Sequence, residues 1–326
     1  MEVVSECNCC GGRDFEPLYR QPDALFHPQE WFDVVRCRAC GFGFVNPRPA
    51  PEEMDRYYPS VYFSHFAEPE QQARYAREAA IVRRAVVAPR PRLLDVGCAH
   101  GDFPRHMRSL GWEVEGVEVS AAAGERHDFP VYRQPLDRIP VAGPRYDAVT
   151  AWSVLEHVHQ PMAYFRKAAE ILRPGGAFVF LVTNLDSLSS RALFREDVPR
   201  HLSFFTEASV RRFCEAAGLE LERVEHDRSI TEMKPANILY YWLYTRFAGR
   251  PPRWEDLPAP RFVAFRGRQP GRWEALAYFL RQPLLVADRL AALAYERWQI
   301  RHRSYGIVIY TARKPVAAAA ARAATG

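Results

Sequence analysis

The chain has 326 residues, of which 48% are hydrophobic and 25% are charged, as in an ordinary globular protein. Its net charge of +5 arises from 44 basic residues interleaved with 39 acidic ones, an excess too small to predict nucleic-acid binding. No apolar stretch approaches the roughly 18 residues that a membrane-spanning helix needs, and the N-terminus lacks a secretory signal pattern. These features predict a cytoplasmic protein with one large core and a small additional module.

The small module is predicted at the N-terminus, because five of the seven cysteines lie within the first 40 residues. Four of them form two C-x-x-C pairs, each followed by glycine: Cys7 with Cys10, and Cys37 with Cys40. In a reducing compartment such pairs are metal ligands more often than disulfides, and two pairs complete a closed tetrahedral site. We therefore expect residues 1–50 to form a zinc ribbon around a structural Zn²⁺, with Cys9 as a surplus thiol.

Residues 51–90 are expected to link the ribbon to the main domain. Pro51 begins a short helix, and an aromatic run from Tyr57 to Phe63 follows it. The spacing of apolar residues then predicts a helix from about Pro69 to Val87. The aromatic run either covers a cofactor or joins the ribbon to the domain, and both interpretations stay open.

The main domain is organised around residues 93–101. An apolar run is followed by a small-residue turn and then by a helical pattern, which is the first unit of a nucleotide-binding α/β domain. Gly97 and Gly101 would allow the backbone to approach a ligand closely. Glu118 ends a second short strand, where a carboxylate can accept hydrogen bonds from both hydroxyls of a ribose.

The turn is poorly suited to a dinucleotide. It lacks the third glycine of the pyrophosphate-binding fingerprint, and Asp95 and Asp102 flank it with negative charge. These carboxylates would repel a pyrophosphate but would suit a ligand that carries an ammonium and a sulfonium. The pattern therefore favours S-adenosylmethionine over a nicotinamide cofactor, and it argues against an oxidoreductase.

Residues 94–101 resemble the first motif of the class I S-adenosylmethionine-dependent methyltransferases. Four further segments resemble later motifs of the family in the same order: Gly116–Ser120, Tyr146–Val149, Ser153–Val158 and Leu172–Gly176. The resemblance covers about residues 90–225 and is strongest to the branch that contains ubiquinone-type O-methyltransferases. It implies a Rossmann-like α/β fold with a seven-stranded sheet. Ala99 departs from the family, which usually has glycine there.

The resemblance also implies site residues. The expected cofactor contacts are Asp95, Gly97, Cys98, Ala99, Gly101, Glu118, Val119, Leu136, Asp137, Trp152 and Ser153. A hydroxyl acceptor must also lose its proton, and histidine is the usual base near neutral pH. His201 and His157 are the candidates, and Glu156 either orients an imidazole or caps a turn. The alternative for His157 is a conformational role, and we expect transfer without a catalytic metal.

The domain boundaries follow from these elements. The methyltransferase core is expected over residues 91–226 and resumes with a final strand over 305–316, before a disordered tail at 317–326. Between them, residues 227–304 are rich in aromatics and should form a helical insert ahead of the last strand. We expect this insert to be a lid over the substrate, the alternative being a dimer interface or a weak contact with a membrane surface.

The sequence thus predicts an S-adenosylmethionine-dependent methyltransferase that methylates oxygen on a small molecule, such as a sugar, a polyketide or another secondary metabolite. The partner is a small-molecule acceptor, with no nucleic acid expected, and the oligomeric state is open, a homodimer included. One alternative is an RNA methyltransferase, although the Asn-Pro-Pro-Tyr type of motif is absent after the fourth strand. Another is a cofactor-binding or scaffolding protein without turnover.

Overall fold

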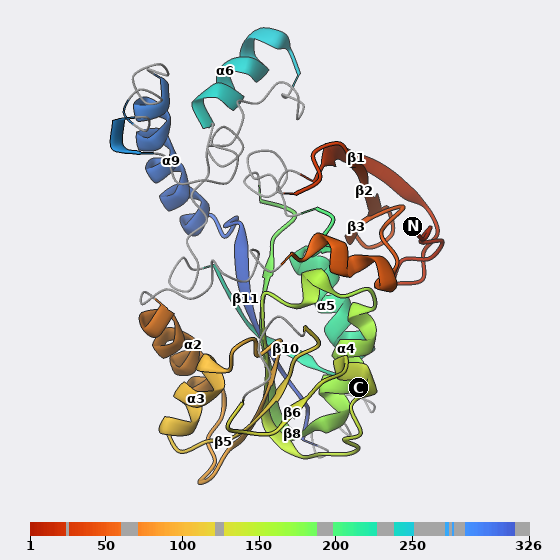
Figure 1. Cartoon of the computed structure of the whole chain (residues 1–326), viewed down its shortest axis with the longest axis vertical. Helices are drawn as coiled ribbons and strands as arrows, with labels where there is room; N and C mark the ends of the chain where they lie inside the picture. The colour runs from red at the N-terminus through yellow and green to blue at the C-terminus, as the bar shows by residue number, and fades with distance from the viewer. Residues whose placement is uncertain are drawn as a thin grey trace, which may run out of the picture.

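The computed structural model describes residues 1–23, 26–59, 71–120, 127–187, 198–226, 238–250, 271–273, 276 and 284–316. A central sheet carries helices on both faces, and a smaller cysteine-rich sheet packs against one side of it (Figure 1). The expected tail at 317–326, part of the aromatic run after Pro59 and much of the insert lie outside the described residues. Within those residues, no helix is long and apolar enough to cross a membrane.

The central sheet has seven strands in the order β10-β11-β8-β7-β4-β5-β6, which confirms the predicted fold class. The strands are β4 Arg92–Val96, β5 Glu113–Val117, β6 Val131–Tyr132, β7 Tyr146–Trp152, β8 Leu172–Thr183, β10 Glu220–Glu225 and β11 Ile307–Arg313. β11 runs antiparallel to both of its neighbours, and the other strands are parallel to one another. The carboxyl ends of the parallel strands therefore meet at one edge, where ligands of such sheets bind.

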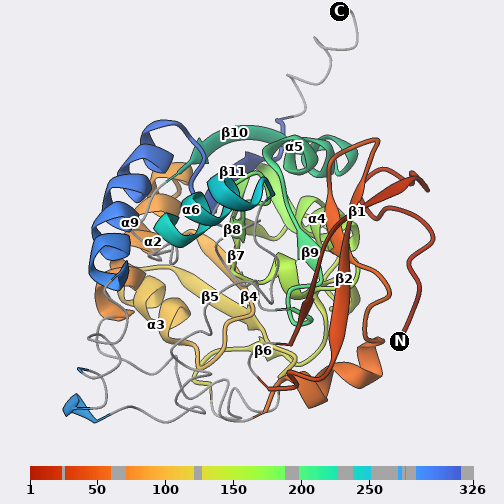
Figure 2. The same ribbon diagram turned by 90° about the horizontal axis from the view of Figure 1, so that it is seen from above.

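Helices cover both faces of this sheet (Figure 2). α4 (Pro161–Ile171) and α5 (Glu207–Ala216) pack on one face, and α2 (Gln71–Ala85) and α3 (Asp102–Ser109) pack on the other. The described insert consists mainly of α6 (Ile238–Ala248) and α9 (Leu284–Arg301). The described residues also contain three short 3₁₀ helices: η1 (Pro51–Tyr57), η3 (Leu136–Arg138) and η4 (Leu155–His157).

Local sequence signals explain most of these boundaries. The Thr206 side chain accepts a hydrogen bond from the Ser209 amide at 3.0 Å and so caps α5 at its first turn. β8 begins at Leu172, directly after α4, and includes the turn-forming residues Pro174–Gly176. Gly175 adopts φ 81° there, and the pairing with β7 shifts register between Tyr146 and Ala148, so the turn is an irregularity within the strand.

The cysteine-rich module is not separate from the core. Its antiparallel sheet has the order β1-β2-β3-β9, with β1 Phe15–Pro22, β2 Trp31–Cys37, β3 Gly43–Val45 and β9 Ser203–Phe204. β9 comes from the chain between β8 and α5, and it pairs with β3 at Gly43 and Phe44. The domain boundary expected at residue 50 therefore divides a sheet whose strands come from both sides of that boundary.

Candidate active site

A carboxylate joins the ends of β4 and β5 at the ligand edge of the sheet. The Glu118 oxygens accept hydrogen bonds from the backbone amides of Ala99 at 2.9 Å and Ser120 at 2.8 Å. The amides of Gly97 and Cys98 donate to the Val117 carbonyl, which fixes the turn against β5. Because each carboxylate oxygen has a second lone pair, the buried Glu118 side chain can still accept from a ligand hydroxyl.

Packing within the protein requires two of the glycines. Gly97 is exposed at the end of β4 with φ 71°, and a β-carbon there would lie 2.5 Å from Cγ2 of Val154. A β-carbon on Gly101 would lie 2.7 Å from the Phe129 ring. Neighbouring side chains thus exclude larger residues here, in addition to any ligand. Ala99 has φ 46°, a left-handed conformation that costs an L-residue about 1–2 kcal/mol.

Three acidic side chains gather below this turn. Asp95 is 3% exposed, and Thr150 donates a hydrogen bond to it at 2.6 Å. Burial raises the pKa of Asp95 well above its ordinary value, and the nearby carboxylates of Glu78 and Glu118 raise it further. Burial also raises the pKa of Glu78, on α2, to about 6 despite its ion pair with Arg74. This concentration of negative charge suits a cationic ligand.

The remaining cofactor candidates lie around the same edge. Val119 is 61% exposed, and Ser153 is exposed with φ 55°. Trp152 is buried edge-on against Phe103, and its indole nitrogen has no hydrogen-bond partner among the described residues. Such an orphaned donor is a common feature of a site that a ligand completes.

Two other cofactor candidates do not present their side chains to a ligand. Leu136 is fully buried in the core on the α4 side, whereas neighbouring Asp137 is exposed. Cys98 is buried against Gly116, and burial raises the pKa of its thiol. Their expected roles as cofactor contacts therefore stay predictions.

The two candidate histidines lie side by side. The rings of His157, in η4, and His201, just before β9, are 4.7 Å apart between centroids and meet edge to face. Nδ1 of His157 lies 3.0 Å from the carbonyl oxygen of Arg200 and 3.0 Å from the hydroxyl of Tyr58. A carbonyl can only accept, so Nδ1 must carry the proton, and Nε2 of the neutral ring is left with its lone pair.

The charge state of His157 agrees with this arrangement. Burial lowers the pKa of His157 well below its ordinary value, and the neighbouring His201 lowers it further. The hydrogen bond to the Arg200 carbonyl acts in the opposite direction. His157 is therefore neutral at pH 7 and can accept a proton at Nε2.

A buried ion pair holds this region to the cysteine-rich module. Arg200 is fully buried, and its guanidinium donates to both carboxylate oxygens of Asp23, at 2.8 and 3.3 Å, and to the Tyr57 carbonyl at 3.2 Å. Asp23 is also fully buried and follows β1. The position of the Arg200 carbonyl, and so of His157, therefore depends on a residue of the N-terminal module.

Glu156 lies beside both histidines. Its backbone carbonyl accepts from the Leu202 amide at 2.7 Å, and its side chain is buried. One ligand atom from each of Glu156, His157 and His201 lies within 4.8 Å of the others, a grouping able to hold a metal ion. The Arg200 carbonyl, rather than Glu156, meets Nδ1 of His157.

The four predicted metal ligands come together. The sulfur atoms of Cys7, Cys10, Cys37 and Cys40 lie within 4.8 Å of one another. The Cys7–Cys40 and Cys10–Cys37 sulfur separations are 3.5 and 3.6 Å, and all four cysteines are free of disulfides. Tetrahedral zinc with bonds of about 2.3 Å needs sulfur separations only slightly longer, so this donor set fits Zn²⁺. The surplus thiol of Cys9 instead donates to the Ser209 carbonyl on α5.

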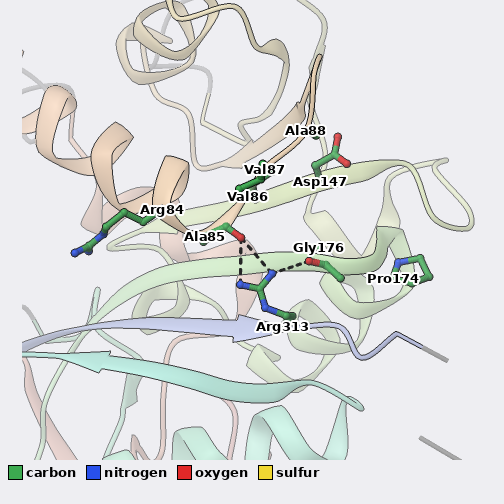
Figure 3. A pocket seen from close by; sticks show the side chains of 10 residues that line it. Arg84, Ala85, Val86, Val87, Ala88, Asp147, Pro174, Gly176 and Arg313 are labelled. Atoms are coloured by element: carbon green, nitrogen blue, oxygen red, sulfur yellow. Dashed lines mark hydrogen bonds between the residues drawn. The ribbon is translucent and has the colours of Figure 1, made fainter. Parts of the chain in front are cut away.

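A cavity of about 460 Å³ lies at the opposite edge of the sheet (Figure 3). Asp147 and Gly176 line it near the amino ends of β7 and β8, and Arg313 donates to the carbonyls of Ala85 and Gly175. The parallel strands of the sheet point away from this cavity. It is therefore remote from Glu118 and the histidines and does not belong to the candidate active site.

Sequence reasoning missed Tyr58, Arg200, Asp23 and Glu78 as parts of the site. Tyr58 belonged to an aromatic run with two open interpretations, and the structure places its hydroxyl on His157. The adjacent Tyr57 is 1% exposed and packs between the module and the core. No short-range pattern signals the other three, because their contacts depend on how distant elements pack.

Comparisons with known proteins identify relatives of this chain. Residues 65–224 match the family described as "Methyltransferase domain". The ubiquinone biosynthesis O-methyltransferase of Cereibacter sphaeroides strain ATCC 17029 is 34% identical over 119 residues, which cover 32% of this chain and 48% of that protein. The enzyme of the same name from Methylobacterium sp. strain 4-46 is 34% identical over 125 residues, covering 34% and 50%. The chain thus spans about half the length of these relatives.

Among solved structures, a chain in the complex that contains the Haloferax volcanii Trm112 methyltransferase activator is 17% identical with a TM-score of 0.49, covering 78% of this chain and 97% of that one. The family assignment rests on the sequence matches together with the seven-stranded sheet. These matches identify residues 65–224 as a methyltransferase domain of the class I S-adenosylmethionine-dependent type.

Proposed function

We propose that this protein transfers the methyl group of S-adenosylmethionine to a hydroxyl oxygen of a small molecule, with His157 as the general base. The observation that supports this most directly is the position of His157. Its Nδ1 is engaged by the Arg200 carbonyl, while burial and His201 keep the ring neutral. The relatives named as O-methyltransferases support oxygen as the methylated atom.

Different residues of this chain would bind the cofactor and take up the proton. Glu118 would accept from the ribose hydroxyls, and the carboxylates around Asp95 would offset the positive charge of the cofactor. The bound cofactor supplies an electrophilic methyl group. His157 would take the acceptor's proton at Nε2, and the Arg200 carbonyl would then stabilise the resulting imidazolium through Nδ1–H. Positioning of the acceptor would supply most of the remaining rate.

The cysteine cluster would hold one structural Zn²⁺. All four ligand positions come from the protein, so the ion would have no open coordination position for chemistry. Its contribution would be to fold the module that carries Asp23 and so to support the histidines indirectly.

Calorimetric titration tests the cofactor assignment. We expect the zinc-loaded protein to bind S-adenosylmethionine and not NADH. Glu118→Gln should weaken binding by about tenfold or more, because it removes a charged acceptor of two hydrogen bonds. The matched control is Glu113→Gln, at the exposed start of β5, the strand that leads to Glu118. It should leave binding of S-adenosylmethionine unchanged. Binding of NADH alone would contradict the assignment, and a screen of hydroxylated acceptors with labelled cofactor then tests methyl transfer.

The pKa shifts give a second expectation for the cofactor. A carboxylic acid with a raised pKa loses its negative charge as pH falls through that value, which is about 6 for Glu78 and is also raised for Asp95. Affinity for S-adenosylmethionine should therefore fall as pH drops from 7.5 to 5.5, by about tenfold if one charge is lost. S-adenosylhomocysteine lacks the sulfonium charge and should show a weaker dependence. Equal pH profiles for the two ligands would show that these carboxylates do not act on the sulfonium.

A further inference from the structure

Helix α9 buries its polar face. Asp288, Glu296 and Gln299 are 7%, 2% and 0% exposed, and their spacing places them on one side of the helix together with buried Ala292. A helix that packs on a globular core normally turns its apolar side inward. The orientation of α9 is the reverse of this pattern.

Specific hydrogen bonds fix that orientation. The Tyr305 hydroxyl donates to Glu296 at 3.1 Å, and the Ser187 hydroxyl donates to Gln299 at 3.0 Å. The amide of Leu239, near the start of α6, donates to Asp288 at 2.7 Å. Turning the helix to bury its apolar side would break all three bonds and leave the buried Tyr305 hydroxyl without this acceptor. The outward direction of the apolar side is therefore built into the fold.

The outward side of α9 is an apolar stripe. Val286, Leu290 and Leu293 are 59%, 65% and 45% exposed, and exposed Arg297 and Arg301 continue the same stripe by helical spacing. The neighbouring helix α6 adds Trp242 and Phe247, which are 61% and 82% exposed, and none of its residues is buried. We call these exposed side chains the α6–α9 surface; Figure 1 labels the two helices that carry them.

The charges on the α6–α9 surface have one sign. The two acidic residues of α9, Asp288 and Glu296, are buried on the side of the helix opposite the stripe. Helix α6 contains no acidic residue. The exposed charged residues are Arg246 on α6 and Arg289, Arg297 and Arg301 on α9. An apolar surface ringed by arginine matches the interface of a bilayer that contains anionic lipids.

We propose that the α6–α9 surface docks on an anionic lipid bilayer, with both helices lying at the level of the headgroups. A second copy of the chain fits this surface less well, because a two-fold interface would place arginines against arginines with no exposed acid on either helix to pair them. The proposal does not depend on methyl transfer, since it rests only on the orientation and charge of α6 and α9.

Vesicle sedimentation of the zinc-loaded 326-residue chain tests the proposal. We expect binding to phosphatidylcholine vesicles that contain phosphatidylglycerol, weaker binding at high salt, and little binding to phosphatidylcholine alone. Arg297→Gln with Arg301→Gln should weaken binding by about 25-fold, at about fivefold for each arginine. Leu290→Ser with Leu293→Ser should weaken it by about tenfold or more through the loss of apolar contact.

The matched control is Val87→Ser, because Val87 is 98% exposed at the opposite edge of the sheet. It should leave vesicle binding unchanged, and circular dichroism should show equal helix content in all variants. Equal binding to neutral and anionic vesicles, or binding that the stripe variants do not change, would overturn the proposal. So would a dimer in sedimentation velocity that Leu290→Ser dissociates, together with no vesicle binding, since the occupant would then be a second copy.

Discussion

His157→Asn should lower kcat by about 10²–10⁴-fold and leave the affinity for S-adenosylmethionine unchanged. The amide nitrogen of asparagine takes the place of Nδ1 and can still donate to the Arg200 carbonyl, so the local structure is retained while the base is lost. Single-turnover kinetics with an identified acceptor measures the chemical step, and calorimetry measures cofactor binding. An unchanged kcat would show that His157 is not the base.

His201→Asn is the companion variant, with a different expected result. His201 helps to lower the pKa of His157, so its removal should let that pKa rise. A base must be neutral to act, and activity is lost as pH falls through its pKa. The acidic limb of the kcat/KM profile should therefore move to higher pH, with substantial activity kept at pH 8. Loss of all activity would make His201 the base, whereas loss in chelator with recovery on adding a divalent ion would make Glu156 and the histidines metal ligands.

Asp23→Ala should destabilise the protein by about 3–5 kcal/mol, because it leaves the buried guanidinium of Arg200 without its carboxylate partner. Urea denaturation followed by tryptophan fluorescence measures this change. Adding Arg200→Met should recover much of the lost stability, since it removes the uncompensated charge.

The matched control is Asp33→Ala, in the same module. Asp33 pairs with Arg20 at 3.7 Å, but both side chains are more than half exposed, so the expected loss is below about 1 kcal/mol. Equal losses in the free energy of unfolding for the two alanine substitutions would show that burial does not make the Asp23–Arg200 pair more important for stability than an exposed pair. Failure of Arg200→Met to recover stability would point to the carboxylate's bonds to the amides of Phe26 and His27 instead.

Elements with a strong local pattern could be predicted from the sequence. The apolar run of β4 and the turn at Gly97 depend on neighbours within a few residues, and the structure confirms both. The four metal ligands could also be predicted, because the short spacing of a C-x-x-C pair places both thiolates on one side of a tight turn. Periodicity and short motifs therefore account for the strand–turn–helix unit at the ligand edge and for the cysteine cluster, whereas the seven-stranded sheet was implied by the family resemblance.

Contacts between distant segments could not be predicted. Asp23 and Arg200 are 177 residues apart, and Tyr58 and His157 are 99 apart, so no periodic signal links them. Glu78 lies in α2, where the many arginines indicate a solvent-exposed helix. It is buried because α2 packs against α3 and the sheet. The orientation of α9 also escaped prediction, because apolar spacing alone favours the opposite face toward the core.

The strand β9 has a consequence for how this protein is made. During synthesis β1, β2 and β3 leave the ribosome early, but the strand that completes their sheet, Ser203–Phe204, follows only after most of the central sheet has been translated. Until then, β3 presents an unpaired edge and Asp23 has no arginine to face. The sheet of the N-terminal module is thus complete only after β9 has been synthesised. Grafting residues 1–50 alone onto an unrelated enzyme would transfer a sheet that lacks this strand.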